Sequence, residues 1–267
     1  MLKDITLGQY FPGNSVIHRL DPRTKLILTV VYLVALFLAK WLISYAVMLA
    51  FLLTVIAVSG VRIKTLLKSL KPILIIVVIT GLLNLFYSQG EVLAKFWIFT
   101  ITKQGLWNAG FMILRITMLV MGTFLLTYTT SPIALTDGLE RLLRPLNRIR
   151  VPVHELSMMM CIALRFIPTL MEETDKIISA QKARGADFES GNLIRRAKAL
   201  VPILVPLFVS SFRRADELAT AMECRCYHGG EGRTKLRELR YAGIDGWAFA
   251  AGGLVLAAVI VLRIYGL

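Results

Sequence analysis

Residues 26–60 read LILTVVYLVALFLAKWLISYAVMLAFLLTVIAVSG, and Lys40 carries the single charge among these 35 positions. The hydrocarbon core of a bilayer takes about 20 helical residues per crossing, so this stretch is just long enough for two short or tilted crossings. We expect the chain to turn near Lys40, and one long oblique helix is the alternative. Either arrangement indicates an integral membrane protein.

The composition of the whole chain supports this class. Apolar residues fill 56% of the 267 positions, and the mean hydropathy is +0.67. Lys and Arg nevertheless total 31 against 17 Asp and Glu, which gives a net charge of +14. Cytoplasmic loops of membrane proteins are rich in Lys and Arg, so the excess indicates topology. No nucleic-acid motif accompanies the charge, so nucleic acid is not expected as a partner.

A polar leader, residues 1–25, precedes the first crossing. Asp21 followed by Pro22 predicts a helix N-terminus, because Asp is a good cap and Pro fits the first helical position. We interpret Asp21 and Arg23 as cap and surface charges that fix this helix. The leader lacks the apolar run and cleavage site of a secretory signal, so no cleavable signal is expected.

Two further crossings complete a membrane domain predicted over residues 26–130. Residues 62–71 contain four cations and no acid, which predicts a cytoplasmic loop. Ile73–Tyr87 is the third crossing, and residues 88–104 are expected outside the membrane or at its interface. The fourth crossing is predicted from about Gly105 to Thr130.

The pattern changes over residues 131–242, where charges recur every few positions. Leu, Ile and Met keep a spacing near 3.6 residues there, which is typical of amphipathic helices and predicts a cytoplasmic helical domain. Leu156–Leu164 and Ala199–Phe212 are apolar enough to resemble crossings. Both are short, and we interpret them as membrane-proximal parts of long helices.

A last crossing is predicted over residues 243–267, around the uncharged run Gly246–Leu262. The expected fold is therefore all-α: a polytopic membrane protein with about five transmembrane helices and a cytoplasmic domain of long amphipathic helices. The N-terminus and that domain are expected on the cytoplasmic side.

No catalytic constellation is found in the sequence. There is no Gly-x-x-x-x-Gly-Lys-Ser/Thr loop, so the chain is not expected to hydrolyse ATP. The three histidines are scattered and lack acids at metal-ligand spacing. Cys224 and Cys226, with a single residue between them, make a poor zinc site, and three cysteines in all argue against a disulfide framework.

The most distinctive feature is a helix ending that occurs twice. A helix from Glu155 is predicted to end at Ala183-Arg184-Gly185, and one from about Leu193 at Cys224-Arg225-Cys226, before Gly229-Gly230. Each ending has Arg between small residues, followed by glycine that can close the helix in the left-handed conformation. Such an Arg is either a solvated cap or an exposed peg whose rigid guanidinium pairs with a carboxylate in a partner's pocket.

Four local motifs link the chain to a known family. They are His18-Arg19-Leu20-Asp21-Pro22-Arg23-Thr24-Lys25, Leu164-Arg165-Phe166-Ile167-Pro168, Ala180-Gln181-Lys182-Ala183-Arg184-Gly185, and Ala221-Met222-Glu223-Cys224-Arg225-Cys226-Tyr227 followed by Arg233-Thr234. In this order and between these apolar runs, nearly the whole chain resembles the transmembrane T component of energy-coupling factor transporters. That family includes the cobalt-transport membrane subunits.

The resemblance implies a coupling role without catalysis. In that family the two x-Arg-x motifs end crossed helices, and each Arg docks in a groove of one ABC-type ATPase subunit. Carried over to this chain, the docking residues would be Ala183, Arg184, Gly185, Cys224, Arg225 and Cys226. Cys226 departs from the Gly or Ala more usual after the second Arg, but it is also small.

The resemblance also implies partners and a location. Two ATPase subunits would bind ATP and Mg, a separate membrane S component would bind the substrate, and this chain would hold no cofactor of its own. The complex would lie in the plasma membrane of a prokaryote. A vitamin, nickel and cobalt all remain open as cargo.

Three other residues are candidates for structural or coupling roles: Arg115, Arg165 and Pro168. Arg115 lies within a crossing, where a charge costs several kcal/mol, so a structural ion pair is expected and a substrate site is the alternative. A self-contained permease or channel for a small anion, lined by Arg115 and Arg165, is the competing hypothesis for the chain. A membrane enzyme would need an acid/base or metal cluster, and the sequence shows none.

Overall fold

The computed structural model describes residues 10–87, 92–96, 99–186, 188, 192–230 and 238–266. The chain divides into two compact units, which we call the membrane unit (Gly8–Leu139 with Leu239–Leu267) and the long-helix unit (containing Glu140–Glu238). The change of pattern at residue 131 does not coincide with the boundary between units, because helix α7 (Pro132–Leu143) continues across that boundary.

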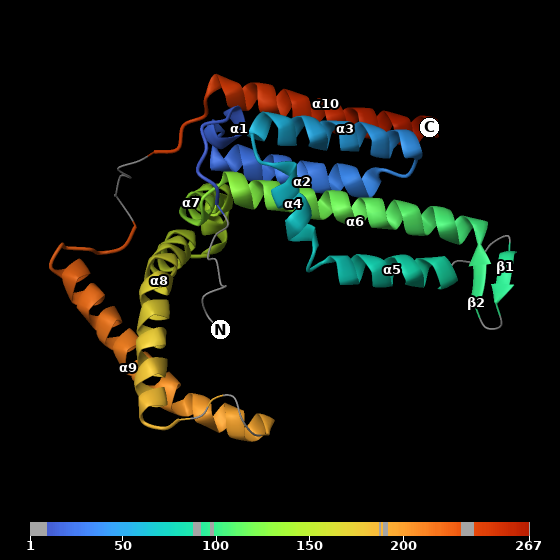
Figure 1. Ribbon diagram of the computed structural model, residues 1–267. Coiled ribbons are helices and arrows are strands. Elements are labelled where there is room, and N and C mark those ends of the chain that lie inside the picture. The colour runs from blue at the N-terminus through green and yellow to red at the C-terminus, as the bar shows by residue number, and fades with distance from the viewer. Residues whose placement is uncertain are drawn as a thin grey trace. The chain divides into compact units, whose positions relative to one another are not determined.

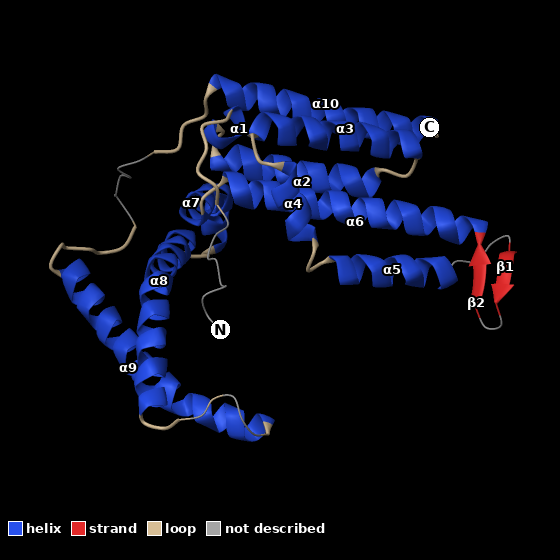
Figure 2. Cartoon of the chain, viewed as in Figure 1, coloured by secondary structure: helices blue, strands red, loops and turns tan. Residues whose placement is uncertain are grey.

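The membrane unit is almost entirely helical (Figures 1 and 2). Besides the first part of α7, its elements are α1 (Val16–Arg19), α2 (Pro22–Leu38), α3 (Leu42–Ser59), α4 (Ile63–Leu70), α5 (Leu74–Tyr87), β1 (Val92–Phe96), β2 (Phe99–Thr102), α6 (Lys103–Thr129) and α10 (Gly243–Tyr265). The predicted all-α polytopic fold is confirmed. One short antiparallel hairpin, β1–β2, was not expected, although its segment is rich in the aromatic and β-branched residues that favour strands.

The turn near Lys40 is confirmed. Helix α2 ends at Leu38 and α3 begins at Leu42, which excludes the single oblique helix. The 17 residues of α2 rise about 26 Å, somewhat less than the roughly 30 Å bilayer core. The predicted fourth and last crossings are found as α6 and α10.

The third crossing differs from the prediction. Helix α5 has 14 residues, a rise of about 21 Å, which is too short to span alone. The residues expected as a basic loop form α4, and the α4–α5 pair is bent by 65°. Among the described residues, α3, α6, α8 and α10 are long and apolar enough to cross a membrane, and the bent pair raises the number to five.

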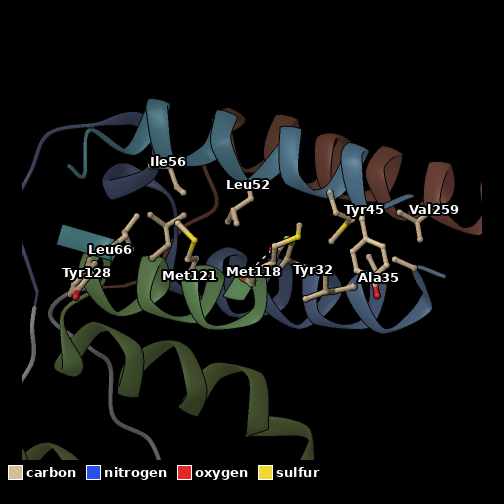
Figure 3. Close-up of a cluster of buried hydrophobic side chains, with 14 residues drawn as sticks. Tyr32, Ala35, Tyr45, Leu52, Ile56, Leu66, Met118, Met121, Tyr128 and Val259 are labelled. Carbon is tan, nitrogen blue, oxygen red and sulfur yellow. Dashed lines mark hydrogen bonds between the residues drawn. The ribbon is translucent and has the colours of Figure 1, made fainter. Parts of the chain in front are cut away.

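The core of the membrane unit is formed where α2, α3, α4, α6 and α10 meet (Figure 3). Large side chains such as Tyr45, Met48 and Met118 are fully enclosed. The Tyr32 hydroxyl donates to the Met118 carbonyl at 3.2 Å. Gly122 of α6 lets this contact form, because a Cβ there would lie 2.6 Å from the Tyr32 ring.

The long-helix unit holds two helices of 31 residues each, α8 (Val153–Ala183) and α9 (Leu193–Glu223), preceded by a 3₁₀ segment, η1 (Arg144–Ile149). Both contain internal proline, Pro168 in α8 and Pro202 and Pro206 in α9, and α9 is bent in Figure 1. The two pack together, and the Arg214 guanidinium of α9 donates to the Glu173 carboxylate of α8 at 2.7 Å. Helix α8 starts two residues before the predicted Glu155, and α9 starts at the predicted Leu193.

Candidate functional site

The first of the two repeated endings closes α8. The Ala186 N–H donates to the Gln181 carbonyl at 3.0 Å, and the Gly185 N–H donates to the Lys182 carbonyl at 3.0 Å. These two bonds define a Schellman motif, which satisfies carbonyls that a helix C-terminus leaves unpaired. Gly185 takes the left-handed conformation that the motif needs, with φ of 86°, as predicted. Arg184 is the residue immediately before it.

The second ending closes α9 with the same bonds. The Tyr227 N–H donates to the Met222 carbonyl at 3.0 Å, and the Cys226 N–H donates to the Glu223 carbonyl at 2.8 Å. Here the left-handed residue is Cys226, with φ of 55°, so the prediction that glycine closes this helix is wrong. Gly229 also has a positive φ, of 100°, but lies outside the motif.

Arg184 and Arg225 therefore occupy equivalent positions, and we call them the cap arginines. Each lies just before the left-handed residue of a Schellman motif, between two small neighbours. All six residues predicted for docking are exposed: Ala183, Arg184, Gly185, Cys224, Arg225 and Cys226. Neither cap arginine forms an ion pair with a described residue. This arrangement fits both a solvated cap and a docking peg, and docking stays a prediction.

Cys226→Gly is expected to stabilise the chain by up to about 1 kcal/mol. A residue with a Cβ pays roughly 1–2 kcal/mol in the left-handed region, whereas glycine pays only the smaller entropic cost of its freedom in the unfolded chain. Thermal unfolding of the purified chain in detergent measures the change. Cys226→Ala keeps the Cβ and should give no gain, and Gly185→Ala at the equivalent position should destabilise. Equal melting temperatures for Cys226→Gly and Cys226→Ala would contradict the conclusion that the left-handed conformation of Cys226 is strained.

A buried polar cluster joins the start of α2 to the start of α10. The Asp21 carboxylate accepts from the Arg23 N–H at 2.9 Å, which confirms the predicted cap, and also from the Arg23 guanidinium at 2.8 Å. The Asp21 N–H donates to the Asp245 carboxylate at 3.0 Å, and the other oxygen of Asp245 accepts from the Ala242 N–H at 2.7 Å. Figure 1 shows α10 alongside α2 and α3.

These residues are not the surface charges that we expected. The Asp21 side chain is 2% exposed and that of Arg23 13%, and Asp245 as a whole is 2% exposed. Arg23 also donates to the Leu239 carbonyl at 3.0 Å and lies 4.0 Å from the centre of the Tyr241 ring. The cluster thus fixes the segment that leads into α10. Asp245 was missed because no local pattern links it to a residue 224 positions away.

Arg115 has hydrogen-bond partners that are neutral. Its guanidinium donates to the Tyr45 hydroxyl at 2.8 Å and to the Ala39 carbonyl at 3.2 Å. The prediction of an ion pair is therefore wrong, since no described residue forms one with Arg115. Ala39 follows the last residue of α2, where a cation is favoured by the unpaired carbonyls and the helix dipole. Arg115 holds the end of α2 to α6.

Arg165 and Pro168 both lie within α8 and are exposed. Arg165 belongs to the long-helix unit and Arg115 to the membrane unit, so the structure does not bring the two together within one unit. The described part of the chain contains no group of three His, Cys, Asp or Glu side chains that could hold a metal ion. Structural or coupling roles for Arg165 and Pro168 stay predictions.

Fold and site together define a class of protein: a polytopic helical membrane component with a separate pair of long helices that end in matched arginine caps. Comparison with known proteins narrows this class. The family CbiQ, described as cobalt transport protein, matches residues 13–236. The chain belongs to this family and, within it, to the energy-coupling factor transporter transmembrane proteins EcfT, a membership that the following relatives establish.

The relatives match over nearly their whole length. The energy-coupling factor transporter transmembrane protein EcfT of Thermosediminibacter oceani is 55% identical over 262 residues, which cover 98% of this chain and 99% of that protein. The EcfT protein of Clostridium kluyveri is 55% identical over 267 residues and 99% of both chains. That of Bacillus subtilis is 49% identical over 261 residues, with 97% and 98% covered. The chain is thus a membrane-embedded transporter component.

Proposed function

We propose that this chain is the coupling subunit of an energy-coupling factor transporter, linking ATP hydrolysis by two ABC-type ATPase subunits to substrate uptake through a separate membrane S component. The observation that carries the proposal is the matched pair of cap arginines. Two equivalent, exposed guanidinium groups, each at the end of a helix of 31 residues, suit docking to two similar partner subunits.

The proposed mechanism rests on the packing of the two long helices against each other. When the two ATPase subunits close on ATP and Mg, each moves the arginine that it holds, and the displacement passes along α8 and α9. The Glu173–Arg214 ion pair and the packing between the helices make the two move together. The movement passes to the S component, which we expect to be held by an apolar surface of this chain. The chain itself carries out no bond-breaking step.

We place the N-terminus and the long-helix unit on the cytoplasmic side of the plasma membrane, where the ATPases have access to ATP. Support comes from the positive charge of residues 62–71 and of residues 141–150, each of which contains four cations and no acid. The substrate, whether vitamin or metal ion, would be bound by the S component.

Affinity purification of the tagged full chain from its native host in mild detergent, followed by mass spectrometry, tests this function. We expect two ABC-type ATPases and one or more small membrane proteins in the eluate, and the small proteins would identify the cargo. Recovery of the chain alone, with the ATPases present but unbound in the lysate, would contradict the proposal. Anion transport by the chain alone in liposomes would support the permease instead.

A further inference from the structure

Helix α4 has an inner face that is fixed to the rest of the membrane unit. Leu66 is fully buried in the core, and the Ser69 hydroxyl forms a hydrogen bond with the buried Tyr128 hydroxyl of α6. Leu70 packs partly buried against the same core. The position of α4 is therefore set by α6, beside which it lies in Figure 1.

The outer face of α4 combines cations with apolar side chains. Lys64, Lys68 and Lys71 recur at i, i+4 and i+7, so they share one face, and all three are exposed. Beside them Ile63 and Leu67, also four residues apart, are 44% and 52% exposed. Basic side chains next to exposed apolar ones are typical of a helix that lies in the interface between lipid headgroups and acyl chains.

The positive charge of this face has no counter-charge in the chain nearby. The sequence contains no acidic residue between Asp21 and Glu91. Arg62 and the three lysines form no ion pair with any residue that the structure describes. Four like charges within ten positions repel one another, and an external anion would remove that repulsion.

A cavity of about 470 Å³ adjoins the start of α4 and is lined on one side by Arg62 and Thr65. Its other walls come from residues 11–15 before α1, from His18 of α1 and from residues 59–61 at the end of α3, and no carboxylate lines it. Hydroxyl, amide and guanidinium groups are donors that suit phosphate oxygens. The cavity is large enough for a phosphate ester headgroup.

An apolar surface follows the cationic face at the other end of α4, after Lys71. After a bend of 65° the chain enters α5, whose first residues Leu74, Ile75 and Ile76 are 56%, 66% and 59% exposed. A cationic surface that passes directly into an exposed apolar one matches a phospholipid, which has an anionic headgroup joined to acyl chains. A partner protein's acidic surface would meet only the cationic half.

We propose that α4 is an interfacial helix that binds anionic phospholipid, with the phosphate at the Arg62 cavity and further headgroups along Lys64, Lys68 and Lys71. The inner leaflet of a cell membrane supplies anionic headgroups, and each nearby Lys or Arg strengthens binding roughly fivefold. Because α4 bonds to Tyr128, close to the end of α6, the bound lipid also fixes the helix that leads into α7.

The test is native mass spectrometry of the purified full chain in mild detergent, titrated with phosphatidylglycerol or phosphatidylcholine. The wild type should retain phosphatidylglycerol in preference to phosphatidylcholine. Arg62→Gln with Lys64→Gln, Lys68→Gln and Lys71→Gln should weaken retention of phosphatidylglycerol at least about tenfold and leave that of phosphatidylcholine unchanged. Lys64→Arg with Lys68→Arg and Lys71→Arg keeps the charge and should retain the lipid.

A matched control removes four exposed cations elsewhere: Arg144→Gln, Arg148→Gln, Arg150→Gln and Lys198→Gln. This variant should bind phosphatidylglycerol as the wild type does. If both quadruple variants lost phosphatidylglycerol equally, binding would follow the net charge of the chain, and the assignment of the site to α4 would be overturned. Displacement of the lipid by millimolar inorganic phosphate would overturn it as well, because the site would then recognise free phosphate.

Discussion

Replacing both cap arginines, Arg184→Ala with Arg225→Ala, is expected to abolish assembly with the ATPase subunits while the chain still inserts and folds. Both side chains are exposed in the described chain and form no ion pair with it, so their removal should leave the fold intact. Losing one partner of a desolvated charge pair costs about 3–5 kcal/mol, so affinity should fall at least hundredfold. Co-purification of the ATPases and ATP-driven uptake in liposomes measure the effect.

Two further variants separate docking from general charge. Lys176→Ala with Lys198→Ala removes the same charge from the same two helices, at exposed positions away from the caps, and should assemble normally. Arg184→Lys with Arg225→Lys keeps the charge but loses the planar fork that binds carboxylates through two hydrogen bonds, and should assemble weakly. If Arg184→Ala with Arg225→Ala assembled and transported normally, the docking role would be wrong, and the two arginines would be solvated helix caps.

The helix ends could be predicted because their signals are local. Glycine directly after Arg184 is the residue that most often takes the left-handed position of a Schellman motif, and the bonds fall where this glycine places them. At the second ending the same reasoning selected glycine, but Gly229 comes too late along the chain. The carbonyls of Met222 and Glu223 need partners within the next few residues, so Cys226 takes the left-handed conformation instead.

Contacts between distant segments could not be predicted in the same way. Arg115 was expected to find an acid, but the neighbouring sequence holds none, and the free carbonyl at the end of α2 takes that place. The charge pattern of residues 62–71 predicted a cytoplasmic loop; the side of the membrane stays a prediction, and the helical backbone of α4 was missed. Leu66 and Leu70 could have indicated a helix, because they recur four residues apart between the lysines.

The polar cluster at the start of α2 is a contact between distant segments, and we expect it to contribute strongly to the free energy of unfolding. Asp21→Ala should destabilise the full chain by about 3–5 kcal/mol, the largest effect that we expect from any single substitution in the membrane unit. It leaves the Arg23 guanidinium, with a side chain only 13% exposed, without its carboxylate, and it also removes the cap of α2. Thermal unfolding in detergent, followed by size-exclusion chromatography, measures the loss.

Asp21→Asn separates the two contributions. Asparagine is as good a cap as aspartate, so the bond to the Arg23 N–H survives and only the ion pair is lost. The variant should lie between wild type and Asp21→Ala. Adding Arg23→Leu removes the unpaired cation, so the double variant should be more stable than Asp21→Asn alone. If Asp21→Asn unfolds at the wild-type temperature, the ion pair contributes nothing, and the cap together with the Asp21 N–H bond to Asp245 must hold α2 to α10.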